Sequence, residues 1–322
     1  MSAILEAENL RKTFGGIVAV DGATFEIEEE SITGLIGPNG AGKTTTFNLI
    51  SGFYEPDSGT VRYDGRDLQE LMEPSRDEKL IWGGASGITF GALGGIAGLG
   101  LFGLGPVPSV GTLAVGAGVG AGVYVGQEKI RQSREGHKNS RPFMLAREGL
   151  ARTFQITREL SEMTALENLM LAPQEQAGEN LVNTWLRRGA VADEEAAVRE
   201  RAEEMLELLE IDHVRHEEAG NLSGGQRKLL ELGRVLMLDP DLILLDEPVA
   251  GVNPTLTEKL MDRIRTLRDE GYTFCIVEHD MEVIMNLSDT IIVMNEGKKL
   301  VEGTPEDVRS DERVIDAYLG GV

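Results

Sequence analysis

The sequence contains almost no cysteine. Cys275 is the single cysteine in 322 residues, so no disulfide can form within the chain, which fits a reducing compartment. It lies in the apolar run YTFCIVEH, and we therefore expect a small buried side chain. The first residues, MSAILEAENLRKTF, include acids and no apolar run, so we expect no signal peptide and a cytosolic N-terminus.

Basic residues are also scarce. The chain has 31 Lys and Arg against 54 Asp and Glu, for a net charge of −23 at pH 7, and only 9 of the basic residues are lysine. Nonspecific binding to nucleic acid needs many basic contacts to phosphates, so this composition argues against a nucleic-acid partner. An acidic, lysine-poor surface is what a salt-rich cytosol would favour, because salt screens the repulsion between the negative charges of the protein. An ordinary acidic soluble protein is the alternative.

Charge of either sign is absent from residues 80–127. This segment has no Asp, Glu, Lys or Arg, and 16 of its 48 residues are glycine. Three interpretations compete: a flexible glycine-rich loop, a self-associating surface patch in the cytosol, and a helical hairpin in the membrane. A flexible linker would be rich in Ser and other polar residues rather than in Leu, Val, Ile and Phe.

The membrane hairpin is the interpretation that we favour. Residues 80–105 and 107–127 are each long enough to span the apolar core of a bilayer, with prolines at the turn between them. Glycines repeat every four residues in both stretches, which would give each helix a face for close packing. Most of the charged residues in the stretch that follows, 129–141, are basic, as is typical of the cytosolic flank of a membrane span.

Short apolar segments elsewhere predict strands of two kinds. Residues 3–30 and 60–67 alternate apolar and polar side chains, which predicts antiparallel strands. Nearly continuous apolar runs predict parallel strands buried on both faces, and these runs are ITGLIG (32–37), LILLDEP (242–248) and TFCIVEH (273–279). Residues 290–303 predict a hairpin that turns at 295–297.

Helical spacing of apolar residues completes the expected fold. The pattern at 193–211 predicts a helix inside a helical block at about 156–222. The fold class is therefore α/β, with an antiparallel sheet added to a core of parallel strands.

The stretch GLIGPNGAGKTTTFNLI carries the pattern GxxxxGK(S/T), directly after an apolar strand and before a helical pattern. Glycines let such a loop turn its N–H groups inward around phosphates, Lys43 can reach the β- and γ-phosphates, and the Thr44 hydroxyl can hold Mg²⁺. A glycine-rich turn without a ligand is the alternative. The residues expected to contact the nucleotide form what we call the phosphate loop: Gly37, Pro38, Asn39, Gly40, Ala41, Gly42, Lys43, Thr44 and Thr45.

The run LILLDEP supplies a second acidic element. A carboxylate at the end of a buried strand is costly unless it meets a metal ion or a base. We expect Asp246 to approach Mg²⁺, directly or through water, and Glu247, one residue later, to polarise the attacking water. The alternative is that DEP opens a helix with Pro248 in its first turn.

The segment NLSGGQRKLLELGRVLML narrows the functional class, which the phosphate loop alone leaves open. Ser223, Gly224 and Gly225 should open a helix, so that unpaired N–H groups and the positive end of the helix dipole are offered to an anion. A second anion site is redundant in a chain that already has a phosphate loop. It makes sense if it closes over the nucleotide that another subunit holds.

These motifs, in this order, resemble those of the ATP-binding subunits of ATP-binding cassette (ABC) transporters. The resemblance covers residues 3–80 and 141–320, through GPNGAGKTT, ARTFQ, LSGGQ (222–226), LILLDEP, GVNP (251–254) and VEHD. It implies that two subunits hold two ATP molecules between each phosphate loop and the opposing LSGGQ. The contacts from LSGGQ, the signature motif of the family, to the ATP of the opposing subunit would come from Ser223, Gly224, Gly225 and Gln226.

Three further residues take their expected roles from the resemblance. It implies that Phe14 in KTFGG stacks on adenine, that Gln155 contacts Mg²⁺ and the attacking water, and that His279 contacts the γ-phosphate. The alternatives are a core phenylalanine, an ordinary loop glutamine and a histidine satisfied within the structure. The remaining histidines show no ligand spacing, and we expect them to be solvated: His137, His213 and His216.

The closest resemblance within the family is to the ATP-binding subunit of high-affinity branched-chain amino acid importers. It rests on GLARTFQ, the long charged stretch before the signature, EPVAGVNP and the ending VEGTPEDV…VIDAYLG. It implies as partners a second ATPase subunit, identical or related, a transmembrane permease and, indirectly, an external substrate-binding protein. The chain would then work at the cytoplasmic face of the membrane. Importers of urea or other amides, a soluble cassette ATPase and a P-loop kinase are the alternatives.

The expected domain organisation follows the order of the motifs. An antiparallel β subdomain with the phosphate loop comes first, then the apolar insertion, a strand leading to Gln155, a helical subdomain, and the rest of the ATPase core. Their expected boundaries are 1–79, 80–140, 141–155, 156–222 and 223–322.

Overall fold

The computed structural model describes residues 2–72, 142–153, 160–174, 176 and 188–319. Residues 1–70 and 142–322 belong to one compact unit, and residues 71–141 belong to another. The hairpin predicted at 80–127 and the candidate residue Gln155 both lie outside the described residues. In the part of the chain that is described, no helix combines the length and the apolar character needed to cross a membrane.

Four strands near the N-terminus form an antiparallel sheet in the order β2-β1-β4-β5. They are β1 (Ala3–Phe14), β2 (Ile17–Glu28), β4 (Ser58–Tyr63) and β5 (Arg66–Asp67). In β2, the side chains of Ala23, Phe25 and Ile27 are buried and the residues between them are exposed, so the alternation in the sequence separates a core face from an exposed face. The antiparallel strands predicted at 3–30 and 60–67 are confirmed.

Six strands form the second sheet, in the order β10-β9-β3-β8-β7-β6. They are β3 (Ile32–Ile36), β6 (Leu150–Arg152), β7 (Leu242–Asp246), β8 (Thr273–Val277), β9 (Thr290–Asn295) and β10 (Lys298–Gly303). Every residue of β3, β7 and β8 is buried, and these strands run parallel, as the continuous apolar runs predict. The β9–β10 hairpin is also confirmed, with positive φ at Glu296 and Gly297 in its turn.

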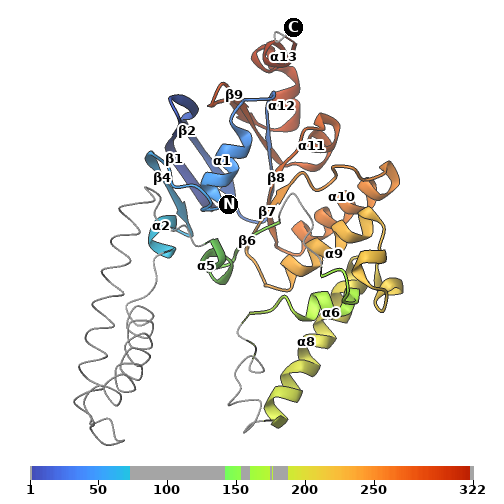
Figure 1. Ribbon diagram of the computed structural model, residues 1–322. Coiled ribbons are helices and arrows are strands. Elements are labelled where there is room, and N and C mark those ends of the chain that lie inside the picture. Colours follow the sequence, from blue (N-terminus) through green and yellow to red (C-terminus); the bar gives the residue numbers. More distant parts are fainter. Residues whose placement is uncertain (1, 73–141, 154–159, 175, 177–187, 320–322) are drawn as a thin grey trace, which may run out of the picture. The chain divides into compact units, whose positions relative to one another are not determined.

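This topology gathers several loops at one edge. Because β3, β7 and β8 are parallel neighbours, the residues that follow them leave the sheet at the same end. Helix α1 (Lys43–Ile50) starts there and packs between the two sheets, against β1, β2 and β8 (Figure 1). The phosphate loop, Glu247 and His279 are therefore brought to a common edge.

The other helices precede β6, lie between β6 and β7, or follow β7 along the chain. They are α2 (Leu68–Leu71), α5 (Pro142–Arg147), α6 (Ala165–Met170), α8 (Arg188–Leu208), α9 (Gly224–Leu236), α10 (Pro254–Asp269), α11 (Met281–Leu287), α12 (Pro305–Ser310) and α13 (Glu312–Leu319), with short 3₁₀ turns at Asp212–Val214 and Ala219–Asn221. Helices α6, α8 and α9 pack on one another. A Cβ at Gly233 would come within 2.9 Å of Leu209 and 3.0 Å of Leu169, so this glycine lets α9 approach its neighbours closely.

The boundaries of α8 differ from those expected at 193–211. The helix begins at Arg188 and ends at Leu208. It ends because the chain turns into a left-handed conformation at Glu210, where φ is 55°, and the N–H of Ile211 donates to the carbonyl of Leu206 over 2.9 Å. Ile211 is buried beyond the end of the helix, so this residue is apolar because it packs in the core and not because the helix continues to it.

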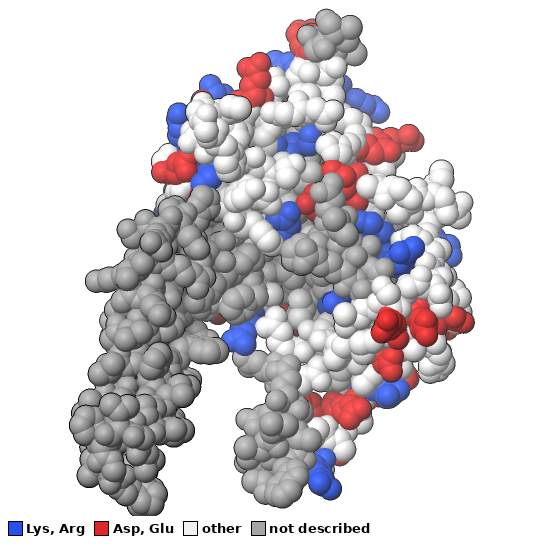
Figure 2. Space-filling view, viewed as in Figure 1, with Lys and Arg blue, Asp and Glu red and all other residues white. Residues whose placement is uncertain are grey.

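Charged side chains of both signs are interspersed on the face shown in Figure 2, where the described residues form no continuous basic surface. Many of the arginines lie beside an acidic neighbour. Arg268, for example, pairs with both Asp269 and Asp289, and Arg62 pairs with both Glu6 and Glu8. Pairing of this kind distributes the few positive charges through an acidic surface.

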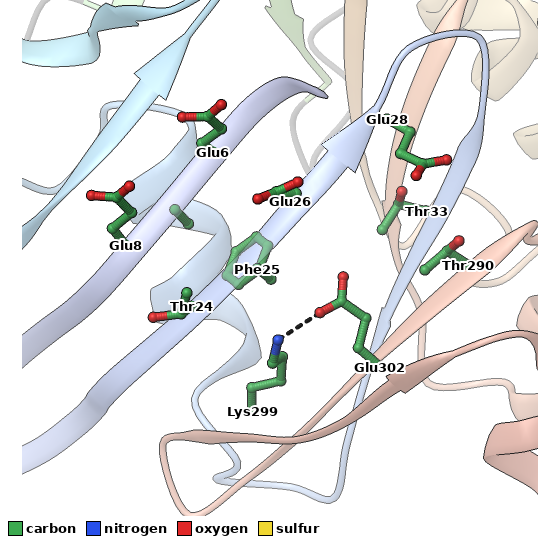
Figure 3. Close-up of a pocket in the computed structure, with 11 residues that line it drawn as sticks. Glu6, Glu8, Thr24, Phe25, Glu26, Glu28, Thr33, Thr290, Lys299 and Glu302 are labelled. Atoms are coloured by element: carbon green, nitrogen blue, oxygen red, sulfur yellow. Dashed lines mark hydrogen bonds and ion pairs between the residues drawn. The ribbon is translucent and has the colours of Figure 1, made fainter. Parts of the chain in front are cut away.

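An acidic cavity of about 330 Å³ lies between strands of the two sheets (Figure 3). Its charged lining consists of Glu6, Glu8, Glu26, Glu28, Glu302 and Lys299. Lys299 and Glu302 form an ion pair of 2.6 Å within it. Among the described residues, no group of three or more His, Cys, Asp or Glu side chains is arranged to hold a metal ion, and the cavity includes no residue of the phosphate loop.

Candidate functional site

The phosphate loop is fixed by close backbone packing. A Cβ at Gly37 would collide with the carbonyl oxygen of Met294, and a Cβ at Gly42, where φ is 94°, would collide with that of Ala19. The N–H of Gly297, in the β9–β10 turn, donates to the carbonyl of Ala41 over 3.0 Å. Glycine is therefore required at these two loop positions by contacts within the fold, before any ligand is considered.

Lys43 is the first residue of α1, and its ammonium group lies inside the loop. Its Nζ donates to the carbonyl of Gly37 over 2.7 Å and to that of Pro38 over 3.1 Å. Burial lowers the pKa of Lys43, and the nearby Glu247 carboxylate opposes this shift. The neighbouring Thr44 is exposed, so its hydroxyl is accessible beside the loop. The arrangement offers an ammonium, backbone N–H groups and a hydroxyl to an anion.

Glu247 follows β7 in a left-handed conformation. Its φ is 50°, and its N–H donates to the carbonyl of Val277 at the end of β8 over 2.9 Å. Such backbone is unfavourable for a residue other than glycine and marks positions where the fold imposes a side-chain direction. Its Oε1 lies 2.6 Å from Nε2 of His279, the residue that follows Glu278 after β8. His279 is about half exposed, so it is not a buried core histidine.

Glu278 is a buried carboxylate beside this pair. Its Oε1 accepts a hydrogen bond from the N–H of Val249 over 2.9 Å, and its Oε2 accepts one from the N–H of His279 over 3.2 Å. One side chain therefore joins the backbone on both sides of the candidate site. Burial raises the pKa of Glu278, and these two hydrogen bonds oppose the shift.

The raised pKa of Glu278 gives a testable pH dependence of stability. A carboxyl group with a higher pKa in the folded than in the unfolded chain contributes stability that is complete below the unfolded pKa and is lost as pH rises through the folded pKa. Glu278→Gln cannot ionise. We therefore expect its free energy of unfolding, relative to wild type, to increase as pH rises above about 4.5, because only the wild-type chain then has a buried carboxylate to ionise.

Urea unfolding of both proteins between pH 4 and pH 8 measures this difference. The matched control is Glu258→Gln, an exposed position on α10. If the difference between Glu278→Gln and wild type stayed constant over this range, the buried carboxyl group would not be the source.

The signature segment LSGGQ opens α9 with a capping box. Oγ of Ser223 accepts from the N–H of Gln226 over 3.3 Å, and Oε1 of Gln226 accepts from the N–H of Ser223 over 2.9 Å. A Cβ at Gly225 would collide with Leu256 on α10, whereas one at Gly224 would meet nothing within 4 Å. The predicted helix start at 223–225 is thus confirmed. Within the described residues, Ser223 to Gln226 make no hydrogen bond or ion pair with the phosphate loop.

His213 also takes part in this helix start. Its side chain is exposed, as expected. Its Nε2 lies 3.3 Å from Nε2 of Gln226, so one side of the ring contacts protein and not solvent.

Phe14 lies at the end of β1 with 40% of its surface exposed, which rules out the alternative of a core phenylalanine. Its ring meets that of Tyr54 edge to face, with centroids 5.3 Å apart. Ile17 and Val18, at the start of β2, are exposed as well. The result is an exposed apolar surface that ends in an aromatic ring, which is suited to stacking against a planar base.

Comparison with known proteins decides the family. Residues 20–86 and 125–250 match the family described as ABC transporter, more than half of the chain. The chain belongs to this family. The match omits residues 87–124, most of the uncharged segment. Residues 298–322 of this ABC transporter subunit match a second family, described as branched-chain amino acid ATP-binding cassette transporter.

Curated relatives of this ABC protein match it over nearly its whole length. It is 33% identical to a probable branched-chain amino acid transport ATP-binding protein of Archaeoglobus fulgidus, over 98% of this chain and 95% of that one. It is 34% identical to a high-affinity branched-chain amino acid transport ATP-binding protein of Pseudomonas aeruginosa, and 31% identical to one of Escherichia coli, each over 98% of both chains.

Solved structures agree with the P-loop α/β fold. A nucleotide-free ATP-binding cassette from an ABC transporter superposes with a TM-score of 0.67 at 30% identity, covering 99% of this chain and all of that one. The ADP conformation of such a cassette gives a TM-score of 0.66 at the same identity and coverage. Nucleotide binding is therefore established for the fold of this ABC subunit.

The residues of this ABC site fit a nucleotide that carries Mg²⁺. The backbone at Gly40 is open, since a Cβ there would meet nothing within 4 Å, and Lys43 and Thr44 provide a cation and a hydroxyl beside it. Asp246 provides a carboxylate, but no cluster of three metal-binding side chains exists among the described residues. Mg²⁺ is often held by one or two protein oxygens together with substrate phosphates, which is the donor set present here.

Two charged residues of this ABC subunit were missed from the sequence. Glu278 lies between a buried strand and His279, and Arg152 ends the short strand β6. A charge within an otherwise buried strand segment is the signal that could have identified both. Gln155, three residues after Arg152, remains a prediction because it lies outside the described residues.

Proposed function

We propose that this chain is the ATP-hydrolysing subunit of an importer for branched-chain amino acids, converting ATP and water to ADP and phosphate. The observation that carries the proposal is the Glu247–His279 contact of 2.6 Å at the sheet edge that also holds the phosphate loop and Asp246. The names of relatives 31–34% identical over 98% of this chain support the choice of substrate.

In the proposed mechanism, the phosphate loop holds the ATP phosphates through its backbone N–H groups and Lys43. Phe14 stacks on adenine. Thr44, Asp246 and Gln155 would hold Mg²⁺, which supplies positive charge to the phosphates when bound. Glu247 accepts a proton from the attacking water, and His279 holds the Glu247 carboxylate and contacts the γ-phosphate.

We place the second half of each ATP site on another subunit. Ser223 and Gln226 cap each other at the start of α9, and the N–H groups of Gly224 and Gly225 between them are left for an anion brought by a partner. The partner is a second copy of this chain or a related ATPase. The pair would act on a transmembrane permease at the cytoplasmic face of the membrane, and an external binding protein would select the substrate.

The predicted membrane hairpin at 80–127 gives a separate expectation, based on sequence alone. Expressed without a permease, the full chain should remain in the membrane fraction after a carbonate wash, because two uncharged stretches would be inserted. A chain lacking 80–127 should be soluble and keep ATP hydrolysis, since the candidate site residues lie outside this segment. Full-length protein that is soluble and monodisperse without detergent would rule the hairpin out.

Purification from native membranes tests the proposed function. We expect a polytopic permease to accompany the chain, and ATP hydrolysis by the reconstituted complex to rise when a binding protein loaded with leucine or valine is added. Stimulation by a binding protein loaded with urea or another amide instead would change the proposed substrate, and a chain that purifies without any permease would favour a soluble cassette ATPase. Phosphate transfer to a small molecule would indicate a kinase.

A further inference from the structure

Arg152 lies at the centre of a buried contact between three elements. It ends β6, and its guanidinium carbon lies over the rings of Phe47 and Phe53, 4.6 and 4.8 Å from their centroids. Its Nη1 donates to Oδ1 of Asn48 over 2.6 Å and to Oγ of Ser51 over 2.7 Å. These four partners lie on or just after α1, the helix that begins at Lys43.

The other branch of the guanidinium reaches Asp246. Nη2 donates to Oδ2 of Asp246 over 2.9 Å, and only 12% of the Arg152 side chain and 9% of the Asp246 side chain are exposed. Within the described residues, Oδ1 of Asp246 accepts no hydrogen bond. A carboxylate held through one oxygen is oriented, while its second oxygen stays available to a metal ion.

The chemistry of this contact requires arginine. A planar guanidinium can lie over two rings while its two NH₂ groups donate in different directions, whereas a lysine ammonium is a single point charge. Burial lowers the pKa of Arg152, and the hydrogen bond and charge of Asp246 oppose this shift. Removing either member would leave an uncompensated buried charge.

We propose that Arg152 is a positioning residue of the ATPase site. It fixes the Asp246 carboxylate relative to α1, so that the metal-binding oxygen and the residues at the start of α1 keep one geometry. This inference rests on the proposed function, because it assigns Asp246 to Mg²⁺. Arg152 itself makes no contact with the phosphate loop among the described residues and acts through Asp246.

The test is metal binding by Arg152→Gln and Arg152→Lys in the full chain. Mn²⁺ serves as the probe, and its affinity is measured by electron paramagnetic resonance with a non-hydrolysable ATP analogue present. We expect both variants to bind Mn²⁺ about 10- to 100-fold more weakly, as for other residues that orient metal ligands. Affinity for the analogue in EDTA should change by less than about threefold, because the phosphate loop is intact.

Arg268→Gln is the matched control. Arg268 is a partly buried arginine, with 27% of its side chain exposed; it pairs with Asp269 and Asp289 and lies on α10. It should lower the melting temperature and leave Mn²⁺ affinity unchanged. Arg152→Lys keeps a positive charge and gives the answer if the Gln variant does not fold.

A second measurement separates positioning from general destabilisation. In an Asp246→Asn background, Arg152→Lys should lower Mn²⁺ affinity little further, because its effect passes through the Asp246 carboxylate. Folded Arg152 variants with wild-type Mn²⁺ affinity, or losses that simply add to that of Asp246→Asn, would overturn the inference. Failure of the wild-type chain to bind the analogue or hydrolyse ATP would instead overturn the proposed function.

Discussion

Replacing Glu247 with glutamine should lower the rate of ATP hydrolysis by about 10²- to 10⁴-fold and leave ATP binding intact. The carboxylate lies 2.6 Å from His279 and follows the strand whose last residue is Asp246, which places a base beside the proposed metal ligand. Glutamine has nearly the same shape but cannot accept a proton from water. The nucleotide-binding groups on the phosphate loop are unchanged.

Steady-state hydrolysis and equilibrium binding of ATP measure the two halves of this prediction. Gel filtration with ATP adds a third readout, since a variant that binds but does not turn over should accumulate as an ATP-bound dimer. Glu258→Gln, on the exposed face of α10, is the control and should hydrolyse ATP at the wild-type rate. A Glu247→Gln protein that turned over as fast as wild type would refute the assignment of Glu247 as the base.

Mixing two inactive variants should restore hydrolysis if each ATP site is built from two copies of the chain. Lys43→Ala removes an ammonium from the phosphate loop, and Ser223→Arg places a bulky cation at the start of α9. Each variant alone should lose about 10²-fold or more of its activity. In a mixed dimer, one site carries both lesions and the other carries neither.

The size of the recovery follows from dimer statistics. With random pairing in an equal mixture, half of the dimers are mixed and each has one intact site of two, so activity should recover to about a quarter of wild type. Mixing Lys43→Ala with itself at the same total concentration is the control. A mixture that stays inactive would place Ser223 and Lys43 in the same site of one chain, and full activity of Ser223→Arg alone would remove the signature from the mechanism.

The strands of the central sheet could be predicted because their burial leaves a local trace. Parallel strands covered on both faces need continuous apolar runs, so β3, β7 and β8 were recognisable although each has only five residues. The phosphate loop was recognisable from the spacing of its glycines and of the Lys and Thr that follow them, although Gly37 and Gly42 are also required by contacts with distant residues. The end of α8 could not be predicted, because Ile211 is apolar owing to its burial in the core beyond the end of the helix.

Residues that act through distant partners were missed for a physical reason. Arg152 meets Asp246 across 94 positions, and Glu278 meets Val249 across 29, so nothing beside either residue in the sequence announces its partner. The contribution of a buried charge to stability depends on which groups the fold places next to it. The sequence shows only that the charge is there.

The pairing of β3 has a consequence for the order in which the protein is made. This strand, which leads into the phosphate loop, has only β8 and β9 as neighbours, and its partners Phe274 and Thr290 lie more than two hundred positions later in the chain. A ribosome that has finished the loop, α1 and α9 has still not supplied a single strand to hold β3 in place. Contacts of such long sequence separation form late and slowly. We therefore expect ATP binding to begin only after translation has passed β9, and shorter products to lack the site.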